Sequence, residues 1–123
     1  PLDAEAKCKL AEIGIRLNKY AFAIDQLMKV IKVDPSYARA HMLLGDAYFC
    51  IGDAIRGIFY YKIAADEDPA SLEKRMKLAC AYAKTHSWEE AGEEFKKALE
   101  LASCPEEELM VYKEYRKINT GNE

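Results

Sequence analysis

The sequence has little of what is typical of membrane proteins or nucleic-acid-binding proteins. No apolar run approaches the roughly 20 residues that a bilayer-spanning helix needs, and no signal-like start is present. Lysines and arginines alternate with acids along the 123 residues, the net charge is −3 and the pI is about 5.5, so no basic face is evident. Phosphate binding needs a concentrated basic face. We therefore expect neither a membrane nor a nucleic acid as partner.

Cysteine is scarce as well, and the four cysteines lie far apart, at Cys8, Cys50, Cys80 and Cys104. None forms a Cys-x-x-Cys pair, and His41 and His86 do not supply the close ligand pairs that zinc requires. The sequence therefore predicts free buried thiols in a reducing compartment and no metal site. A cytoplasmic location is expected, and a nuclear one fits equally.

The sequence also lacks a recognisable catalytic arrangement. There is no phosphate-cradling glycine loop, and His41 and His86 have no nucleophile at a telling distance. Ser87 is better explained as a helix cap. We expect no catalytic residues, no cofactor and no enzymatic activity in this stretch of chain.

What the sequence does contain is a period. Asp34-Pro35 is followed 34 residues later by Asp68-Pro69, and the same step divides the chain into residues 4–37, 38–71 and 72–105. Small and large residues alternate at fixed places in each segment. An alternation kept at this period is typical of helical-hairpin repeats, so the sequence predicts an all-α protein.

Each segment is expected to form two helices joined by a tight turn. In the second segment Gly52 ends the first helix as a left-handed residue and Asp53 caps the next. Asn18 takes the place of that glycine in the first segment. In the third segment Ser87 and Glu90 are predicted to form a capping box instead.

A final helix is expected over residues 105–118. Pro105 and the acids that follow it suit a helix N-terminus. The predicted apolar face carries Leu109, Tyr112, Tyr115 and Ile118. Such a helix would cap the exposed end of an open stack, so residues 1–123 are interpreted as one domain.

Small residues recur at two positions of each segment, with large residues beside them. The small positions hold Ala11, Gly45, Ala79, Ala23, Gly57 and Ala91, and the large ones hold Leu10, Leu44, Leu78, Leu27, Tyr61 and Phe95. In this pattern the chain resembles the tetratricopeptide repeat family over about residues 4–105. The resemblance implies a right-handed superhelix of three helix-turn-helix hairpins with a C-terminal capping helix.

The chain departs from the family pattern in the first segment and at one recurring position. Gly14 stands where the later segments have Tyr48 and Tyr82. The early tryptophan of the family is replaced by Lys7, His41 and Arg75. We expect the fold to tolerate these changes, with the first repeat as the loosest.

The resemblance also implies a concave groove lined by the first helices. Its partner-binding residues would be Glu12, Met42, Asp46, Phe49, Met76, Lys77, Cys80 and Lys84. The centre of this set is apolar, and methionines adapt to irregular helical partners. The competing interpretation is that Met42 and Phe49 pack against neighbouring helices or against the C-terminal tail.

One known use of the family is the capture of chaperone C-terminal carboxylates. That use needs lysine, arginine and asparagine at five positions, which here hold Cys8, Glu12, Leu43, Glu73 and Lys77. Only Lys77 fits, and Glu12 would repel an anion. A chaperone carboxylate is therefore disfavoured as the ligand.

The outer face offers a second candidate surface. Phe22 and Phe59 are both expected to point outward from second helices. If they are adjacent, they would form a contact patch for a partner or for a second copy of the chain, and so for self-association.

The leading hypothesis is a protein-interaction scaffold or adaptor that binds a peptide or helical segment in its concave groove. The alternative is a structural segment of a longer solenoid within a multisubunit assembly, with contacts through its outer face. A third is a three-repeat chaperone of the secretion type. The start at Pro1, without a methionine, favours a fragment of a longer protein.

Overall fold

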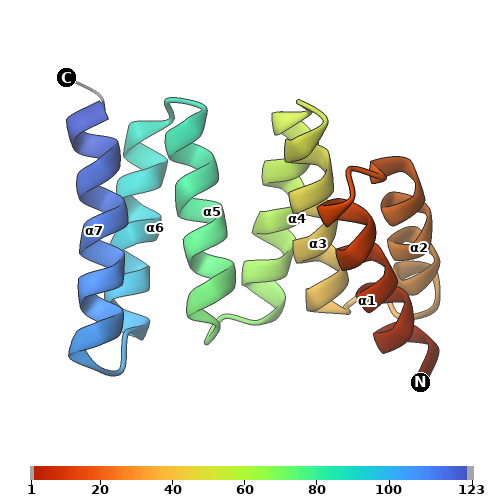
Figure 1. The fold of residues 1–123 in the computed structure, drawn as a ribbon. Coiled ribbons are helices and arrows are strands. Elements are labelled where there is room, and N and C mark those ends of the chain that lie inside the picture. Colours follow the sequence, from red (N-terminus) through yellow and green to blue (C-terminus); the bar gives the residue numbers. More distant parts are fainter. Residues whose placement is uncertain (1, 122–123) are drawn as a thin grey trace. The chain divides into compact units, whose positions relative to one another are not determined.

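The computed structural model describes the backbone of residues 2–121 and the side chains of residues 3–117. Within that range it contains seven α-helices and no strand (Figure 1). The helices are α1 Leu2–Arg16, α2 Tyr20–Val33, α3 Ala38–Cys50, α4 Ala54–Glu67, α5 Leu72–Lys84, α6 Trp88–Leu101 and α7 Pro105–Gly121. In each predicted segment the first helix packs against the second. The all-α class and the hairpin pairing are confirmed.

All three hairpin turns contain one residue with a left-handed backbone. These are Asn18 with φ 62°, Gly52 with φ 87° and His86 with φ 63°, spaced by the same 34 residues. The first two confirm the prediction. The capping box predicted in the third turn is wrong, because the Ser87 side chain makes no capping hydrogen bond. His86 ends the helix there instead, so the third turn has the geometry of the other two.

The helix caps differ between hairpins. The Asp53 carboxylate accepts a hydrogen bond from the Arg56 backbone N–H at 3.1 Å, as predicted. The Ser71 hydroxyl does the same for Lys74 at the start of α5, at 3.2 Å. Each of these bonds satisfies one of the amide groups that a helix N-terminus leaves without an internal partner.

The chain divides into two compact units, Pro1–Asp68 and Pro69–Glu123. The first contains the hairpins α1–α2 and α3–α4, and the second contains the hairpin α5–α6 with α7. The single domain predicted for residues 1–123 stays a prediction. None of the helices in the described range is long and apolar enough to span a bilayer.

The small positions of the first unit allow close helix contacts. A β-carbon at Gly45 would come within 2.5 Å of the Tyr61 ring, and one at Gly57 would collide with the Phe49 ring. Ala11 and Ala23 are fully buried in the α1–α2 hairpin. The predicted role of the small residues is therefore confirmed in this unit, since any larger side chain would push the paired helices apart.

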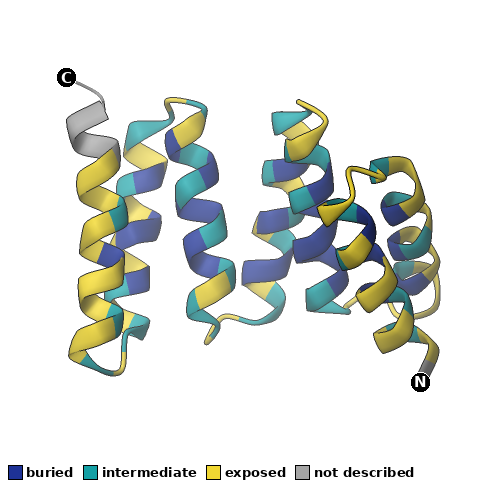
Figure 2. Ribbon diagram, in the orientation of Figure 1, coloured by how far each residue is buried: buried dark blue, intermediate teal, exposed yellow. Residues whose placement is uncertain are grey.

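One large position does not behave as predicted. Leu10 was expected to fill the core like Leu44 and Leu78, but 47% of it is exposed, whereas Leu44 is fully buried. The reason is the position of α1 in the unit. Among the described helices, α3 packs against α1, α2 and α4, whereas α1 packs mainly against α2 and α3. The buried and exposed faces of these helices can be compared in Figure 2.

The missing tyrosine of the first repeat has a local replacement. At Gly14, an added β-carbon would lie 3.1 Å from the ring of Phe22, which comes from α2. In the second repeat the aromatic ring comes from the first helix instead of the second. Tyr48 of α3 supplies this ring, and the Arg56 guanidinium of α4 lies 5.7 Å from the ring centroid. Phe22 therefore fills part of the space that a first-helix tyrosine fills elsewhere.

The second unit has a core of alanines and aromatic rings. Ala79, Ala91 and Ala98 are buried with Phe95 between α5 and α6. The early tryptophan position holds Arg75, which is buried and donates to the Glu94 carboxylate at 2.8 Å. Lys97 also pairs with Glu94, at 3.2 Å. A charge can be buried in this way because an opposite charge and hydrogen bonds accompany it.

Helix α7 packs on α5 and α6, so the predicted terminal helix is confirmed, although it runs to Gly121, beyond the predicted end at 118. Among the described side chains of α7, Val111 is buried, whereas Leu109 and Tyr112 are each 55% exposed. Tyr115 meets the ring of Phe95 edge-on at 5.4 Å. Ile118, predicted on the same face, lies outside the described side chains.

The loop before α7 has a cap that the sequence pattern did not indicate. The Glu107 carboxylate accepts hydrogen bonds from the Ser103 backbone N–H at 2.8 Å and from its hydroxyl at 2.9 Å. These bonds favour the charged carboxylate, so they lower the pKa of Glu107.

Candidate functional site

The predicted groove residues fall into two sets, one in each unit. Glu12, Met42, Asp46 and Phe49 belong to α1 and α3, and Met76, Lys77, Cys80 and Lys84 belong to α5. Each set is described within its own unit. Their joint use by a partner stays a prediction.

In the first unit, Glu12 links the two first helices. Its carboxylate accepts a hydrogen bond from Arg39 of α3 at 3.3 Å and pairs with Arg16 one helical turn on, at 3.5 Å. All three side chains are partly or largely exposed. Glu12 is therefore engaged with two cations of its own chain.

Beside that bridge, α3 presents an acid and an aromatic ring. The Tyr61 hydroxyl from α4 donates a short hydrogen bond to the Asp46 carboxylate. Phe49 stacks on the Tyr61 ring with centroids 5.6 Å apart and lies over Gly57. Phe49 is only partly buried, so one part of its ring is held by the hairpin and the rest is accessible. A ring held in this way loses little conformational entropy when a partner binds.

The two methionines of the predicted centre are not accessible. Met42 is 5% exposed and Met76 is 8% exposed. They contribute to packing, which is the competing interpretation given above for Met42. The accessible apolar part of the predicted set is thus Phe49 together with the partly buried Cys80.

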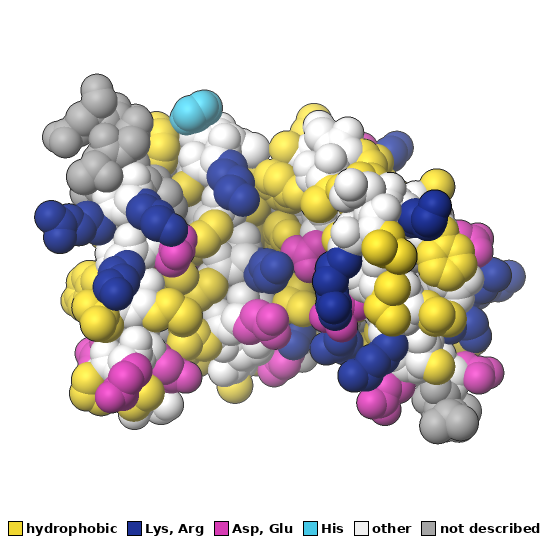
Figure 3. All heavy atoms as spheres, viewed as in Figure 1, with side chains coloured by type: hydrophobic (Ala, Val, Ile, Leu, Met, Phe, Trp, Pro, Cys, Tyr) yellow, Lys and Arg dark blue, Asp and Glu magenta, His cyan; other side chains and the backbone are white. Residues whose placement is uncertain are grey.

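In the second unit, Cys80 lies in a charged environment. Burial raises the pKa of its thiol, and Glu114 of α7 raises that pKa further, while Lys84, Lys77 and Lys117 act in the opposite direction. Figure 3 shows basic side chains gathered over α5 and α7 in this view. This surface therefore combines a protonated, weakly polar thiol with several cations and one carboxylate.

The outer-face residues are exposed but were not found together. Phe22 is 44% exposed and Phe59 is 58% exposed. Phe22 lies over Gly14, and Phe59 meets Tyr60 edge-on with ring centroids 5.2 Å apart. No ring contact between Phe22 and Phe59 occurs among the described residues. Their role as a contact patch stays a prediction.

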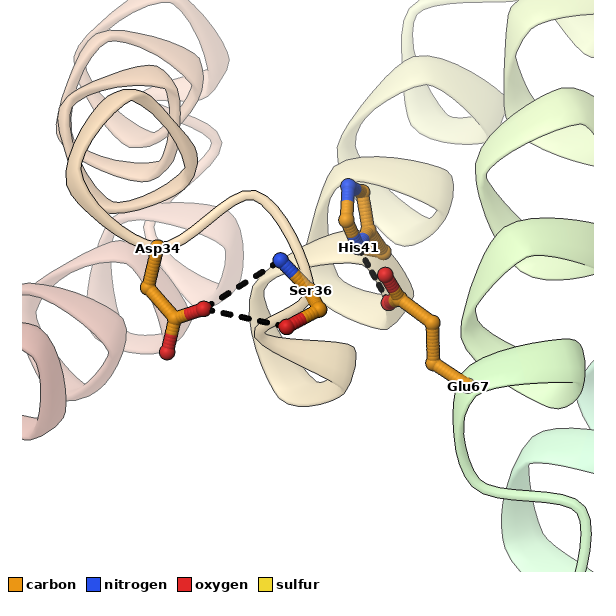
Figure 4. A network of polar contacts seen from close by, with 4 residues as sticks. All are labelled: Asp34, Ser36, His41 and Glu67. Atoms are coloured by element: carbon orange, nitrogen blue, oxygen red, sulfur yellow. Dashed lines mark hydrogen bonds and ion pairs between the residues drawn. The ribbon is translucent and has the colours of Figure 1, made fainter.

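A buried polar cluster in the first unit was missed by the sequence reasoning. His41 is 5% exposed, and its Nδ1 lies 2.6 Å from a carboxylate oxygen of Glu67 (Figure 4). The His41 ring stacks on Tyr60, which in turn stacks on Tyr48. The sequence could have indicated this cluster, because Lys7, His41 and Arg75 occupy the position of the family's early tryptophan. A polar residue at a buried position needs a hydrogen-bond partner.

The same close view includes the connection between α2 and α3. The Asp34 carboxylate accepts hydrogen bonds from the Ser36 backbone N–H and hydroxyl, both at 3.2 Å (Figure 4). Such an Asx-type turn holds the loop that precedes α3 and so helps to position His41.

All four cysteines are free, as predicted, but they are not all buried. Cys8 is buried, Cys80 and Cys104 are partly buried, and Cys50 is exposed. The prediction of uniformly buried thiols is therefore wrong for Cys50, the last residue of α3, which is exposed. The described residues contain no group of three or more His, Cys, Asp or Glu side chains that could hold a metal ion.

A shallow cavity of about 180 Å³ lies between α6 and α7 in the second unit. It is lined by Gly92, Phe95, Lys96, Leu99, Val111, Tyr112 and Tyr115. Gly92 lines this cavity without a side chain, and a β-carbon there would have no neighbouring atom within 4 Å.

Comparison with known proteins agrees with the repeat pattern. A family model described as "TPR repeat" matches residues 15–52. A crystal structure of MamA is 30% identical with a TM-score of 0.74, over 80% of this chain and 57% of that one. These matches support the tetratricopeptide repeat family that the repeat pattern indicates. Repeats of this family mediate protein–protein interactions.

Two further proteins are similar to this chain. The first such domain of Spaghetti (RPAP3), bound to an HSP90 peptide, has a TM-score of 0.83 at 21% identity, over 98% of this chain and 93% of that one. At that identity the likeness concerns the fold alone. Serine/threonine-protein phosphatase T of Aspergillus oryzae is 30% identical over 98 residues, which are 77% of this chain and 19% of the phosphatase. The chain thus spans about a fifth of that relative's length.

Proposed function

We propose that the chain is a protein-interaction adaptor that binds a peptide or helical segment of a partner through the first helices of its repeats. Phe49 is the apolar anchor on α3, and Lys77 and Lys84 on α5 attract an acidic flank of the partner. The single observation that carries the proposal is Phe49, whose ring is held against Gly57 and Tyr61 while part of it stays accessible. Partly exposed, rigidly held aromatic rings are typical interface anchors.

The charges support the same assignment. Glu12 is paired with Arg39 and Arg16, so the acid that lies on this side of α1 does not oppose an acidic partner. Lys84 is exposed on α5. Apolar contact would supply most of the affinity, and the lysines would mainly set orientation and association rate.

A chaperone C-terminal carboxylate stays disfavoured as the ligand in this proposal. Of the five positions that would hold it, Cys8 and Leu43 are buried and Glu12 is already bridged to arginines. A buried thiol and a buried leucine offer no cation or amide to a carboxylate. The peptide seen with Spaghetti (RPAP3) is therefore not the partner proposed for this chain.

We assign no catalysis and no cofactor to this chain, and we place it in the cytoplasm or nucleus. The free thiols, including the exposed Cys50, suit a reducing compartment. The phosphatase relative adds no activity to this proposal, since the match covers 19% of that protein. The structural role in a longer solenoid, with contacts through Phe22 and Phe59, stays the alternative.

A peptide selection tests the proposal. A random peptide library displayed on phage is panned on the immobilised chain, and the selected peptides are expected to combine an apolar residue with Asp or Glu. Phe49→Ala should weaken their binding by more than about 1 kcal/mol. Lys84→Ala should weaken it less, and chiefly at low salt, because surface charges are screened.

The controls separate the two surfaces. Lys96→Ala removes another exposed lysine of the second unit and should leave binding unchanged, whereas Phe49→Leu, which keeps an apolar contact over Gly57, should retain part of it. Loss of binding in Phe22→Ser/Phe59→Ser, with the Phe49 and Lys84 variants intact, would assign partner capture to the outer face and refute the proposal.

A further inference from the structure

The cavity between α6 and α7 is mostly apolar and is lined by residues of the second unit alone. Its lining includes Phe95 and Val111, which are buried in the core of that unit, and Leu99, which packs against the same core. Tyr112 and Tyr115 of α7 add two aromatic rings, and Tyr115 is held edge-on against Phe95 with the ring centroids 5.4 Å apart. An apolar group that enters this cavity therefore exchanges water for contacts with a packed core.

Gly92 stands at a position that holds an isoleucine in both earlier repeats. One and two periods before it the same column holds Ile58 and Ile24, both partly buried, and Ile24 packs against the core of the first unit. Helix α2 packs on α3 in that unit, as α6 packs on α7 in the second. A β-carbon at Gly92 would meet no atom within 4 Å. The third repeat thus has open space at a position where the first repeat has a packed isoleucine.

The volume of the cavity limits what it can hold. It measures about 180 Å³. A cavity of about 150 Å³ lined by Leu, Ile and Phe side chains binds benzene, whereas sites for drug-sized ligands measure about 300–1,000 Å³. One six-membered ring therefore fits this cavity and a two-ring ligand does not. An aromatic ring suits the lining, because it packs edge-on or offset against the rings of Phe95 and Tyr115.

The charge at the cavity is positive. Of the lining residues that the structure describes, Lys96 alone carries a charge, and its side chain is exposed. The next residue, Lys97, pairs with Glu94, whereas Lys96 makes no ion pair within the described part of the chain. A negatively charged group attached to a bound ring would therefore meet an ammonium group that has no carboxylate of its own.

From this geometry we infer that the cavity between α6 and α7 is a binding site for a small aromatic carboxylate. The ligand is a free acid with one ring and a short side chain, of the size of phenylpropionate. Its ring lies among Phe95, Leu99 and Tyr115, and its carboxylate pairs with Lys96. The ring supplies most of the affinity by leaving water, and the lysine selects the acid over neutral analogues.

Titration of the nitrogen-15-labelled chain with phenylpropionate, followed by two-dimensional NMR, tests the inference. Saturable shifts are expected for the backbone amides of Gly92, Lys96 and Tyr112, with a dissociation constant in the millimolar range or below, as a ligand of this size can reach. The neutral analogue phenylpropionamide should bind roughly threefold more weakly, because it loses the pairing with an exposed lysine. Naphthylpropionate, with two fused rings, should produce no saturable shift.

Variants of the chain place the site. Gly92→Ile gives the third repeat the side chain that the first two repeats carry and should abolish binding of phenylpropionate, while Gly92→Ala should weaken it less. Lys96→Ala should lower the affinity for the acid to that for the amide. Its matched control is Lys62→Ala, the same change at an exposed lysine exactly one period earlier, which should leave binding within about twofold. Thermal melts verify that each variant folds.

The absence of saturable shifts with phenylpropionate overturns the inference, as does unchanged binding in Gly92→Ile or equal affinity for the acid and the amide. A short peptide with Phe next to Asp is the remaining arm. Shifts at Gly92 and Tyr112 with this peptide, but none with the free acid, would assign the cavity to a protein partner and also overturn the inference. The adaptor site shares no residue with the cavity and is tested by Phe49→Ala, so the two proposals can fail independently.

Discussion

The α3–α4 and α5–α6 hairpins share one repeat pattern but bring their helices together by different chemistry. In α3–α4 the close contacts are glycines beneath aromatic rings, with Gly45 under Tyr61 and Gly57 under Phe49. In α5–α6 the corresponding positions are alanines, and the buried Arg75–Glu94 pair joins the two helices. The repeat pattern thus specifies how much space lies between the paired helices, while quite different side chains can fill that space.

The glycine contacts of α3–α4 and the buried ion pair of α5–α6 are sensitive to different kinds of substitution. A glycine contact is broken by adding atoms, because a packed interior has no room for them. A buried ion pair is broken by removing one partner, because the other charge is then buried alone. Variants of the two hairpins should therefore respond to opposite kinds of substitution.

The largest effect is expected in α5–α6. Glu94→Ala leaves the Arg75 guanidinium buried without its main carboxylate and should destabilise the fold by about 3–5 kcal/mol. Urea unfolding followed by the fluorescence of Trp88, the one tryptophan of the chain, reports on this unit. Glu93→Ala, an exposed neighbour on α6, should change stability by less than about 0.5 kcal/mol.

A double variant sharpens that result. Replacing both charges, with Arg75→Leu and Glu94→Leu together, should be less harmful than Glu94→Ala alone, because no unpaired charge stays buried. A Glu94→Ala variant as stable as the unchanged chain would mean that the pair does not hold α5 against α6.

The next effect is expected in α3–α4. Gly45→Leu should destabilise the chain by about 1–3 kcal/mol, because the added atoms meet the Tyr61 ring. The control is Gly92→Ala in α6, where a β-carbon meets nothing within 4 Å. That change should stabilise by about 0.4–1 kcal/mol through the lower entropy of the unfolded chain. An unchanged melting temperature for Gly45→Leu would show that Gly45 is not at a close helix contact.

The smallest effect concerns the caps of the two second helices. Asp53→Ala removes the hydrogen bond to the Arg56 amide and should cost about 0.5–2 kcal/mol. Ser87→Ala removes a side chain that makes no capping bond and should be close to neutral. Urea unfolding followed by circular dichroism measures both, and equal losses would restore the capping box that the structure contradicts.

Much of the fold could be predicted because the signals were local. Gly52 and Asn18 each indicate a residue with a left-handed backbone, and Asp53 indicates a helix cap. Both features depend on interactions within a few residues of themselves. The left-handed backbone of His86 was not predicted, because a histidine by itself does not indicate that conformation. The predicted groove set was less informative, since Met42 and Met76 have the spacing of accessible residues and yet are buried.

The sequence by itself determined the 34-residue period, the helical hairpins and the positions that must be small, because these follow from helix periodicity, turn geometry and side-chain volume. Only the tertiary structure decided what covers each face. Leu10 and Leu44 are the same residue in the same column, and they differ in exposure because α3 packs against three of the described helices whereas α1 packs against two. The partners of Arg75 and His41 likewise come from other helices, at sequence separations that no local pattern encodes. Burial and pairing are properties of neighbours, and neighbours exist only once the chain has folded.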